Sequence, residues 1–101
     1  MKVFDLNQMP SYPYEERHKN VFFQQDEFKV RIIDLKPGAS MPTCEMASYV
    51  LFYVISGSAK VTVNDEIADL AAGQCLITEP ATLSMTSKNG VKIMGIQINK
   101  K

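Results

Sequence analysis

Short runs of β-forming residues, each closed by glycine, proline or asparagine, follow one another along most of this 101-residue chain. Asn64-Asp65 and Asn89-Gly90 are hairpin signals, because these residue types tolerate a positive φ. Short strands at this spacing are typical of an all-β sandwich or barrel. We expect Ser56-Gly57-Ser58 to break one long run into two strands. The predicted strands cover 21–23, 28–32, 49–55, 59–63, 66–70, 75–78, 82–86 and 91–98.

The N-terminal part has a different composition. Residues 7–20 hold Pro10, Pro13 and a charged cluster over 15–19, and they carry no long helical stripe of apolar residues. Loop or edge structure is therefore expected there. The predicted organisation is an N-terminal arm with the first strand over 1–27, packed on the barrel or on a partner, followed by the barrel over 28–101.

Charge and cysteine content restrict the partners and the compartment. Eleven basic residues balance eleven acidic ones, which argues against nucleic acid or an anionic membrane as partner. The uncharged run over 46–59 is shorter than the ~20 residues that a membrane-spanning helix needs, and no signal peptide is visible. Cys44 and Cys75 are expected to be free thiols in a reducing cytoplasm, and a disulfide between them remains an alternative.

The strand predicted over 49–55 is apolar on both faces. Val50, Phe52 and Val54 share one face, and the opposite face is equally apolar. A strand with one solvated face would show polar residues at alternate positions. The outer face must then be covered, either by the N-terminal segment or by a second subunit. A chain this short has little material to spare, which favours a homodimer through the outer face near 49–55.

Gly38 and Gly57 frame a segment that resembles the first motif of the cupin superfamily. Its ending, Tyr53 to Gly57, is similar to the Tyr-Val-Leu-x-Gly ending of that motif. Ala72-Gly73-Gln74 resembles the start of the second motif, with Pro80 one residue late. The resemblance covers roughly 28–98. It implies an all-β jelly-roll β-barrel, the cupin-like double-stranded β-helix, and often a dimer.

The same resemblance implies that the usual cupin metal ligands are missing. The two histidines of the first motif fall on Cys44 and Met46, and its glutamate falls on Val50. The histidine of the second motif, counted from Pro80, falls on Met85. These side chains do not offer the imidazole and carboxylate donors that most cupin metals require. We therefore expect no metal and no other cofactor.

The leading hypothesis is a metal-free cupin barrel that binds a small molecule in an apolar pocket, with the reaction unknown. The predicted pocket residues are Cys44, Met46, Val50, Phe52 and Met85. One alternative is an enzyme with a soft Cu(I) site formed by Cys44, Met46 and Met85. Another is a structural or assembly protein whose barrel is simply filled. Fold alone does not decide among them.

Charged and aromatic residues outside the motifs allow further interpretations. Lys29 and Arg31 share one strand face and could contact an anionic ligand at the barrel mouth. With 28, 30 and 32 packed inward, however, we expect this basic face at solvent or at a subunit edge. Tyr12 and Tyr14 on the arm either pack on the barrel or cover a pocket mouth.

The remaining reactive side chains are expected to have structural roles. Cys44 with His18 would be a nucleophile pair only if the fold brought them together, and a buried thiol with a surface histidine is the simpler interpretation. Cys75 lies in an apolar strand and is expected in the core. Glu45 and Glu79 are expected to be solvated.

Overall fold

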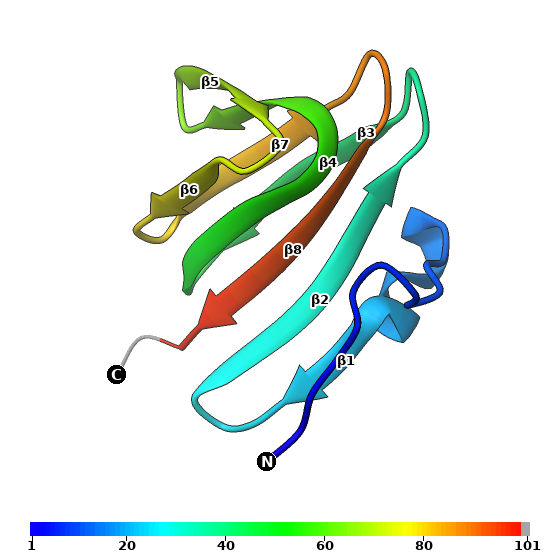
Figure 1. The fold of residues 1–101 in the computed structure, drawn as a ribbon. Helices are drawn as coiled ribbons and strands as arrows, with labels where there is room; N and C mark the ends of the chain where they lie inside the picture. Colours follow the sequence, from blue (N-terminus) through cyan, green and yellow to red (C-terminus); the bar gives the residue numbers. More distant parts are fainter. Residues whose placement is uncertain (100–101) are drawn as a thin grey trace.

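All strand pairs within residues 1–99, the part of the chain that the computed structural model describes, are antiparallel. The prediction of an all-β fold is confirmed, and the curled sheet is visible in Figure 1. The elements are a 3-10 helix η1 (Tyr14–Asn20) followed by β1 (Val21–Gln24), β2 (Phe28–Leu35), β3 (Ser40–Met46), β4 (Tyr49–Val63), β5 (Glu66–Ala71), β6 (Cys75–Thr78), β7 (Ala81–Thr86) and β8 (Val91–Ile98).

Strand β4 connects the two halves of the fold. Its first half pairs with β8 and β6, and its second half pairs with β5 and β7. The strand curls between these halves (Figure 1), where the register shifts between Val54 and Ser56 and Gly57 takes a φ of 79°. The predicted break at 56–58 is therefore wrong. The glycine bends a single strand instead of ending it.

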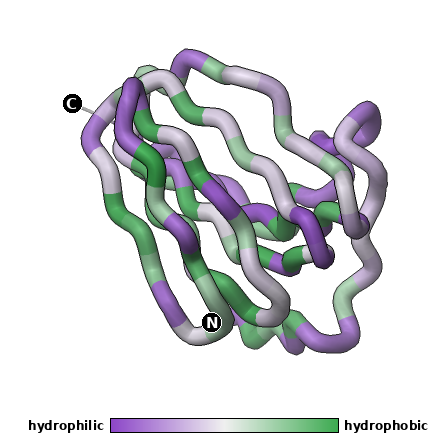
Figure 2. The backbone as a smooth tube through the Cα atoms, turned by 90° about the horizontal axis from the view of Figure 1, so that it is seen from above, coloured by the Kyte–Doolittle hydropathy of each residue, from purple (hydrophilic) through white to green (hydrophobic). Residues whose placement is uncertain are grey.

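The core lies between two groups of strands. One group runs β1-β2-β8-β4-β6, and the other runs β3-β7-β4-β5. Hydrophobic and hydrophilic residues alternate along the strands in Figure 2, as expected where one face is buried. Val54, Val61 and Ile93 are fully buried at the centre, and Leu83 and Met85 are almost so.

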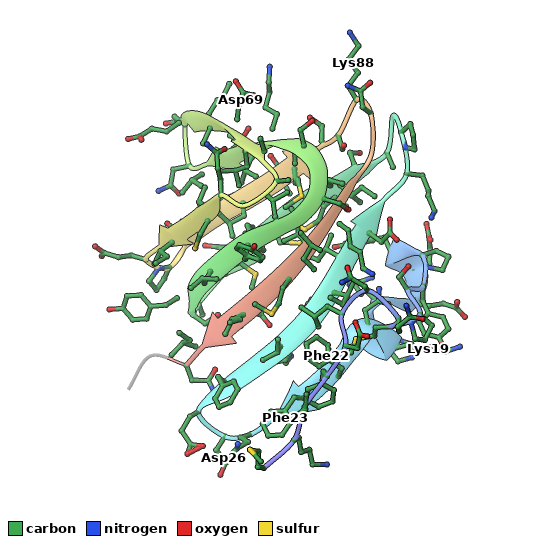
Figure 3. The ribbon with its side chains drawn as sticks, viewed as in Figure 1. Lys19, Phe22, Phe23, Asp26, Asp69 and Lys88 are labelled. Atoms are coloured by element: carbon green, nitrogen blue, oxygen red, sulfur yellow. The ribbon has the colours of Figure 1, made fainter. Side chains whose placement is uncertain are left out.

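The N-terminal segment runs along β1 and β2 (Figure 1). The Phe4 ring lies 4.8 Å from the Phe22 ring, and the Lys92 Nζ donates a hydrogen bond to the Leu6 carbonyl oxygen at 2.6 Å. Figure 3 shows Phe22 and Phe23 beside this segment. The segment thus packs on the barrel-like body. Of the barrel predicted over 28–101, the last two residues lie outside the described residues.

The predicted orientation of β2 is wrong. Arg31 stands opposite Gly95 of β8, which in turn stands opposite Phe52 of β4. Because Phe52 is a core residue, Arg31 shares the inner face of the sheet. Ile32 lies on the outer face and is still only 1% exposed. The covering N-terminal segment explains this burial, and it makes the outer face of β2 the more apolar one.

Two elements were not predicted from the sequence. Strand β3 contains Pro42, which lacks a backbone donor, and its pairing with β7 is irregular between Met41 and Cys44. The 3-10 helix η1 lies in the stretch expected to be loop or edge. No helix among residues 1–99 is both long enough and apolar enough to cross a membrane.

Candidate functional site

A cavity of about 200 Å³ opens on the inner face of the sheet, between β2, β3 and β4. Its walls are mainly apolar, and it is partly open to solvent. A cavity of about 150 Å³ is large enough for a benzene-sized molecule, so this space suits a small ligand. The apolar side chains that line it include Ile33, Met41, Met46, Val50, Phe52 and Leu83.

The structure brings four of the five predicted pocket residues to this cavity. Cys44, Met46, Val50 and Phe52 all line it, whereas Met85 does not. Met85 is 1% exposed and belongs to the hydrophobic core.

The placement of Met85 in the pocket is therefore wrong, and strand register gives the reason. The irregular pairing of β3 with β7 sets Cys44 opposite Leu83, two residues before Met85. Leu83 takes the position at the cavity. Met85 faces Val61 of β4 and Met41 of β3.

Gly95 makes room for the cavity. It lies between Arg31 and Phe52 in a cross-strand row, and it also lines the cavity. A Cβ at this position would approach the Phe52 ring to 3.4 Å and the Ile33 Cδ1 to 3.5 Å. The missing side chain therefore lets the Phe52 ring and the Ile33 side chain lie close to the β8 backbone at the cavity wall. A glycine inside a strand often marks such a close approach.

Tyr14 and Cys44 meet at the cavity mouth. The 3-10 helix η1 carries Tyr14 toward β3, where its hydroxyl lies 3.4 Å from the Cys44 Sγ. Cys44 also lies 3.5 Å from the Pro42 carbonyl oxygen, to which its thiol donates. The hydrogen bond with Cys44, together with burial, raises the pKa of Tyr14 above its ordinary value. The phenol is therefore neutral and able to donate at physiological pH.

Arg31 supplies a cation to the polar end of the cavity. Its Nη2 donates to the Gln97 Oε1 at 2.9 Å, and the Gln97 Nε2 donates to the Met46 Sδ at 3.7 Å. Burial lowers the pKa of Arg31 from its ordinary value, and the nearby Arg17 adds to this effect. A guanidinium nevertheless stays charged at neutral pH.

Arg17 extends the cationic region at the mouth. Its guanidinium lies over the Tyr14 ring at 4.4 Å from the centroid, and its Nη1 donates to the Tyr14 carbonyl oxygen at 3.1 Å. Arg17 lines the same cavity as Arg31. Two arginines, a phenol and a thiol thus gather at one end of an otherwise apolar space.

The donor set at the cavity does not fit the metal site implied by the cupin resemblance. Its lining contains no histidine, aspartate or glutamate among residues 1–99, and these residues contain no group of three or more His, Cys, Asp or Glu suited to a metal. The soft site of the alternative hypothesis needs Met85 beside Cys44 and Met46, and Met85 does not line the cavity.

The other reactive residues lie away from the cavity. His18 is exposed on η1 and does not line the cavity with Cys44. Cys75 is exposed, so its predicted place in the core is wrong. It stands opposite Tyr53, on the outer face of β4. Both cysteines are free.

Gln97 and Gly95 were not predicted as site residues, and Arg31 was expected on the wrong face. The available signal was Gly95 in the middle of the run 91–98. Gly95 comes to lie beside the basic residue Arg31 only through the pairing of β2 with β8, which joins residues far apart in sequence.

Comparison with known proteins identifies the fold. No protein-family profile and no curated protein matches the sequence. A protein from Thermus thermophilus matches with a TM-score of 0.82 and 20% identity over 100% of both chains. A cupin superfamily protein from Desulfitobacterium hafniense matches with a TM-score of 0.74 and 20% identity, over 79% of this chain and 74% of that one.

Salicylate 1,2-dioxygenase from Pseudoaminobacter salicylatoxidans also matches, with a TM-score of 0.67 and 16% identity, over 71% of this chain and 20% of the dioxygenase. The match therefore covers only one part of this longer enzyme. Taken with the curled antiparallel sheet and the framing glycines, these likenesses establish that this small chain, which lacks the usual metal ligands at the motif positions, has the cupin fold.

Proposed function

We propose that this protein is a metal-free cupin barrel that binds a small molecule in its apolar cavity. The observation that supports the proposal is the cavity itself, about 200 Å³ with apolar walls and a few polar groups at one end. Such a combination is the usual form of a small-molecule site. A barrel filled by its own side chains would leave no such space.

The donor chemistry supports binding without a metal. The cavity residues offer sulfur, amide, phenol and guanidinium groups, and none of these belongs to the imidazole and carboxylate set that hard or borderline metals prefer. One matched fold neighbour is named as a dioxygenase, but a shared fold does not carry a reaction with it.

Binding of the neutral apolar probe toluene tests this function. In methyl-labelled protein, we expect saturable NMR shifts at the cavity residues Ile33 and Leu83, and none at the exposed residues Ile67 and Ile77. The proposal is contradicted if the cavity methyls do not shift, or if the exposed ones shift equally.

A blocking variant gives the matched control. Met46→Trp places a large ring in the cavity and should abolish toluene binding, because Met46 lines the space. Glu45→Trp adds the same ring at the adjacent, exposed position and should leave binding unchanged. Equal binding by the two variants would place the toluene elsewhere and reject the cavity as the site.

We also propose a cytoplasmic homodimer that forms through the outer face of β4. Tyr49 and Tyr53 are each 38% exposed there, and Ile77 of β6 and Ile98 of β8 are 72% and 44% exposed. Their strands are neighbours, because Tyr49 pairs with Ile98 and Leu51 with Ile77. The two free cysteines support the cytoplasm as the compartment.

A further inference from the structure

The polar end of the cavity is cationic and has no acidic partner. Arg17 and Arg31 line it, and no aspartate or glutamate among residues 1–99 does so. The ion pairs within residues 1–99 join Lys19 to Glu16 and Lys36 to Asp34. Neither arginine therefore has a carboxylate from the described residues within 4.0 Å.

Arg31 is held in place while much of its donor capacity is left open. Gln97 accepts one hydrogen bond from the guanidinium at 2.9 Å, and a guanidinium offers five N–H donors in a planar fork. A half-buried cation whose partner is a neutral amide is costly to desolvate. Burial accordingly lowers the pKa of Arg31. A bound anion would compensate this cost.

The opposite end of the cavity is hydrocarbon. From Arg31 the inner face continues across Gly95 to the Phe52 ring, with Val50 and Leu83 also lining the space. Because Gly95 has no side chain, the Phe52 ring and the Ile33 Cδ1 lie over the β8 backbone at this point of the row. A ligand in the cavity therefore meets a charged group at one end and an apolar wall at the other.

The surroundings of the mouth also favour an anion. Arg17 and Arg31 continue into an open groove on the outside of the cavity, which Lys29 and His18 also line. Glu15 is the acidic residue in the groove. The cations outnumber it, so an anion would be drawn toward the mouth. The neutral Tyr14 hydroxyl and the Cys44 thiol add further polar groups at the mouth.

We infer that the cavity binds a small organic monoanion, with its carboxylate on Arg31 and its apolar body against Phe52 and Val50. This inference rests on the proposed function and names the ligand class of the same site. The Arg31 fork matches the two oxygens of a carboxylate. Arg17 closes the mouth over Tyr14, and Gln97 is a positioning residue for Arg31.

Calorimetry with pairs of equal shape tests the inference. Benzoate is compared with benzamide, and hexanoate with hexanamide, so that each pair differs mainly in charge. We expect each carboxylate to bind about tenfold to a hundredfold more tightly than its amide, as for a hydrogen bond to a charged group. Inorganic phosphate, which has no apolar body, should bind more weakly than either carboxylate. Equal binding within the pairs, or equally tight phosphate binding, would overturn the inference.

Arg31→Met tests the role of the charge apart from that of the apolar cavity. This variant should lose the preference for carboxylate over amide and should still bind toluene. Its free energy of unfolding should be no lower than that of the wild type, because an uncompensated cation is replaced by an apolar chain. Lys88→Met makes the same change of charge at an exposed position far from η1 (Figure 3) and should keep the preference.

The two proposals fail in different ways. If toluene binds but the wild type does not prefer carboxylates, or if Arg31→Met keeps the preference, the assignment of a carboxylate to Arg31 is wrong and the cavity function stands. If toluene and all carboxylates fail to bind the wild type, the function itself is wrong.

Discussion

Tyr14 shows how a single contact couples the N-terminal region to the cavity. The residue lies on η1, and its hydroxyl reaches Cys44 thirty positions later in the chain. Its backbone carbonyl also accepts the hydrogen bond from Arg17. The phenol therefore fixes the edge of the cavity mouth while the guanidinium lies over its ring. Loss of this contact would loosen the mouth without touching the apolar walls.

The titration of Tyr14 is a direct test of this contact. Its pKa is raised chiefly by the hydrogen bond with Cys44, so one tyrosine should ionise above the usual value of ~10. In Cys44→Ala, the last tyrosinate absorbance step should move to lower pH. Cys75→Ala removes the other, exposed thiol and should leave that step where it is.

The raised pKa of Tyr14 should also make the free energy of unfolding depend on pH. Because the folded pKa lies above the unfolded value, the contribution of this group is fully present below pH ~10 and is lost as the pH rises through the folded pKa. Denaturant titrations should show a steeper loss above pH ~10 in the wild type than in Cys44→Ala. Identical tyrosine titrations in both proteins would count against the contact.

The site residues differ in how far sequence could place them. Cys44, Met46 and Val50 were placed by the motif spacing between the two framing glycines, and Phe52 by its position on the same strand face as Val50. Both signals lie within a short stretch of sequence and do not depend on how distant strands pair. Arg31 could not be placed in this way, because its position in the cavity depends on the pairing between β2 and β8. No pattern within β2 contains that information.

At the scale of elements, the bend in β4 joins the two groups of strands that line the cavity. Ser56 to Ser58 is where the strand leaves one group of strands and joins the other. The Ser58 amide donates to the Gly90 carbonyl oxygen at 3.2 Å, and the Ser87 hydroxyl donates to the Ser58 carbonyl oxygen at 2.7 Å. These bonds fix the bend against the β7–β8 connection.

Gly57→Ala tests the bend. A Cβ at Gly57 would overlap the Gly90 carbonyl oxygen and would come within 2.9 Å of the Val91 Cα, at a φ of 79°. Gly73 has a similar φ of 85° but open space around the same position. Gly73→Ala should cost about 1–2 kcal/mol for the left-handed backbone alone, and Gly57→Ala about 3 kcal/mol or more, since the clash is added.

Urea unfolding of the two alanine variants measures the difference. Both substitutions change the flexibility of the unfolded chain in the same way, so this contribution cancels between them. Equal costs would mean that Gly57 is required for its φ alone and that the Gly90 backbone can move aside.

Local patterns predicted strands well where alternation or a turn signal was present. Ala59–Val63 and Val91–Ile98 are strands as expected. Strand β3 was missed because the segment around Pro42 shows neither signal. The prediction assigned the inner and outer faces of β2 the wrong way round, because alternation defines two faces but does not indicate which of them lies toward the core. The N-terminal segment, not the core, buries Ile32.

At the scale of the whole molecule, the N-terminal segment covers only part of the outer face. It lies over β1 and β2 (Figure 1), whereas Tyr49, Tyr53, Ile77 and Ile98 on β4, β6 and β8 remain exposed. A continuous apolar patch of this kind is characteristic of an interaction surface. Self-association through one patch about a two-fold axis is the commonest way in which a small chain covers it.

The proposed homodimer predicts a specific pattern of disruption. In an isologous interface each substitution occurs twice, so Tyr53→Lys with Ile77→Lys places four cations in the contact and should give a monomer. Ile67→Lys serves as the control, because Ile67 is 64% exposed on β5, in the other group of strands.

Light scattering after gel filtration at micromolar concentration measures the mass. A monomeric wild type would refute the dimer, and a dimeric double variant would move the interface away from β4 and β6. Neither result would alter the cavity, because the patch and the cavity lie on opposite faces of the same strands.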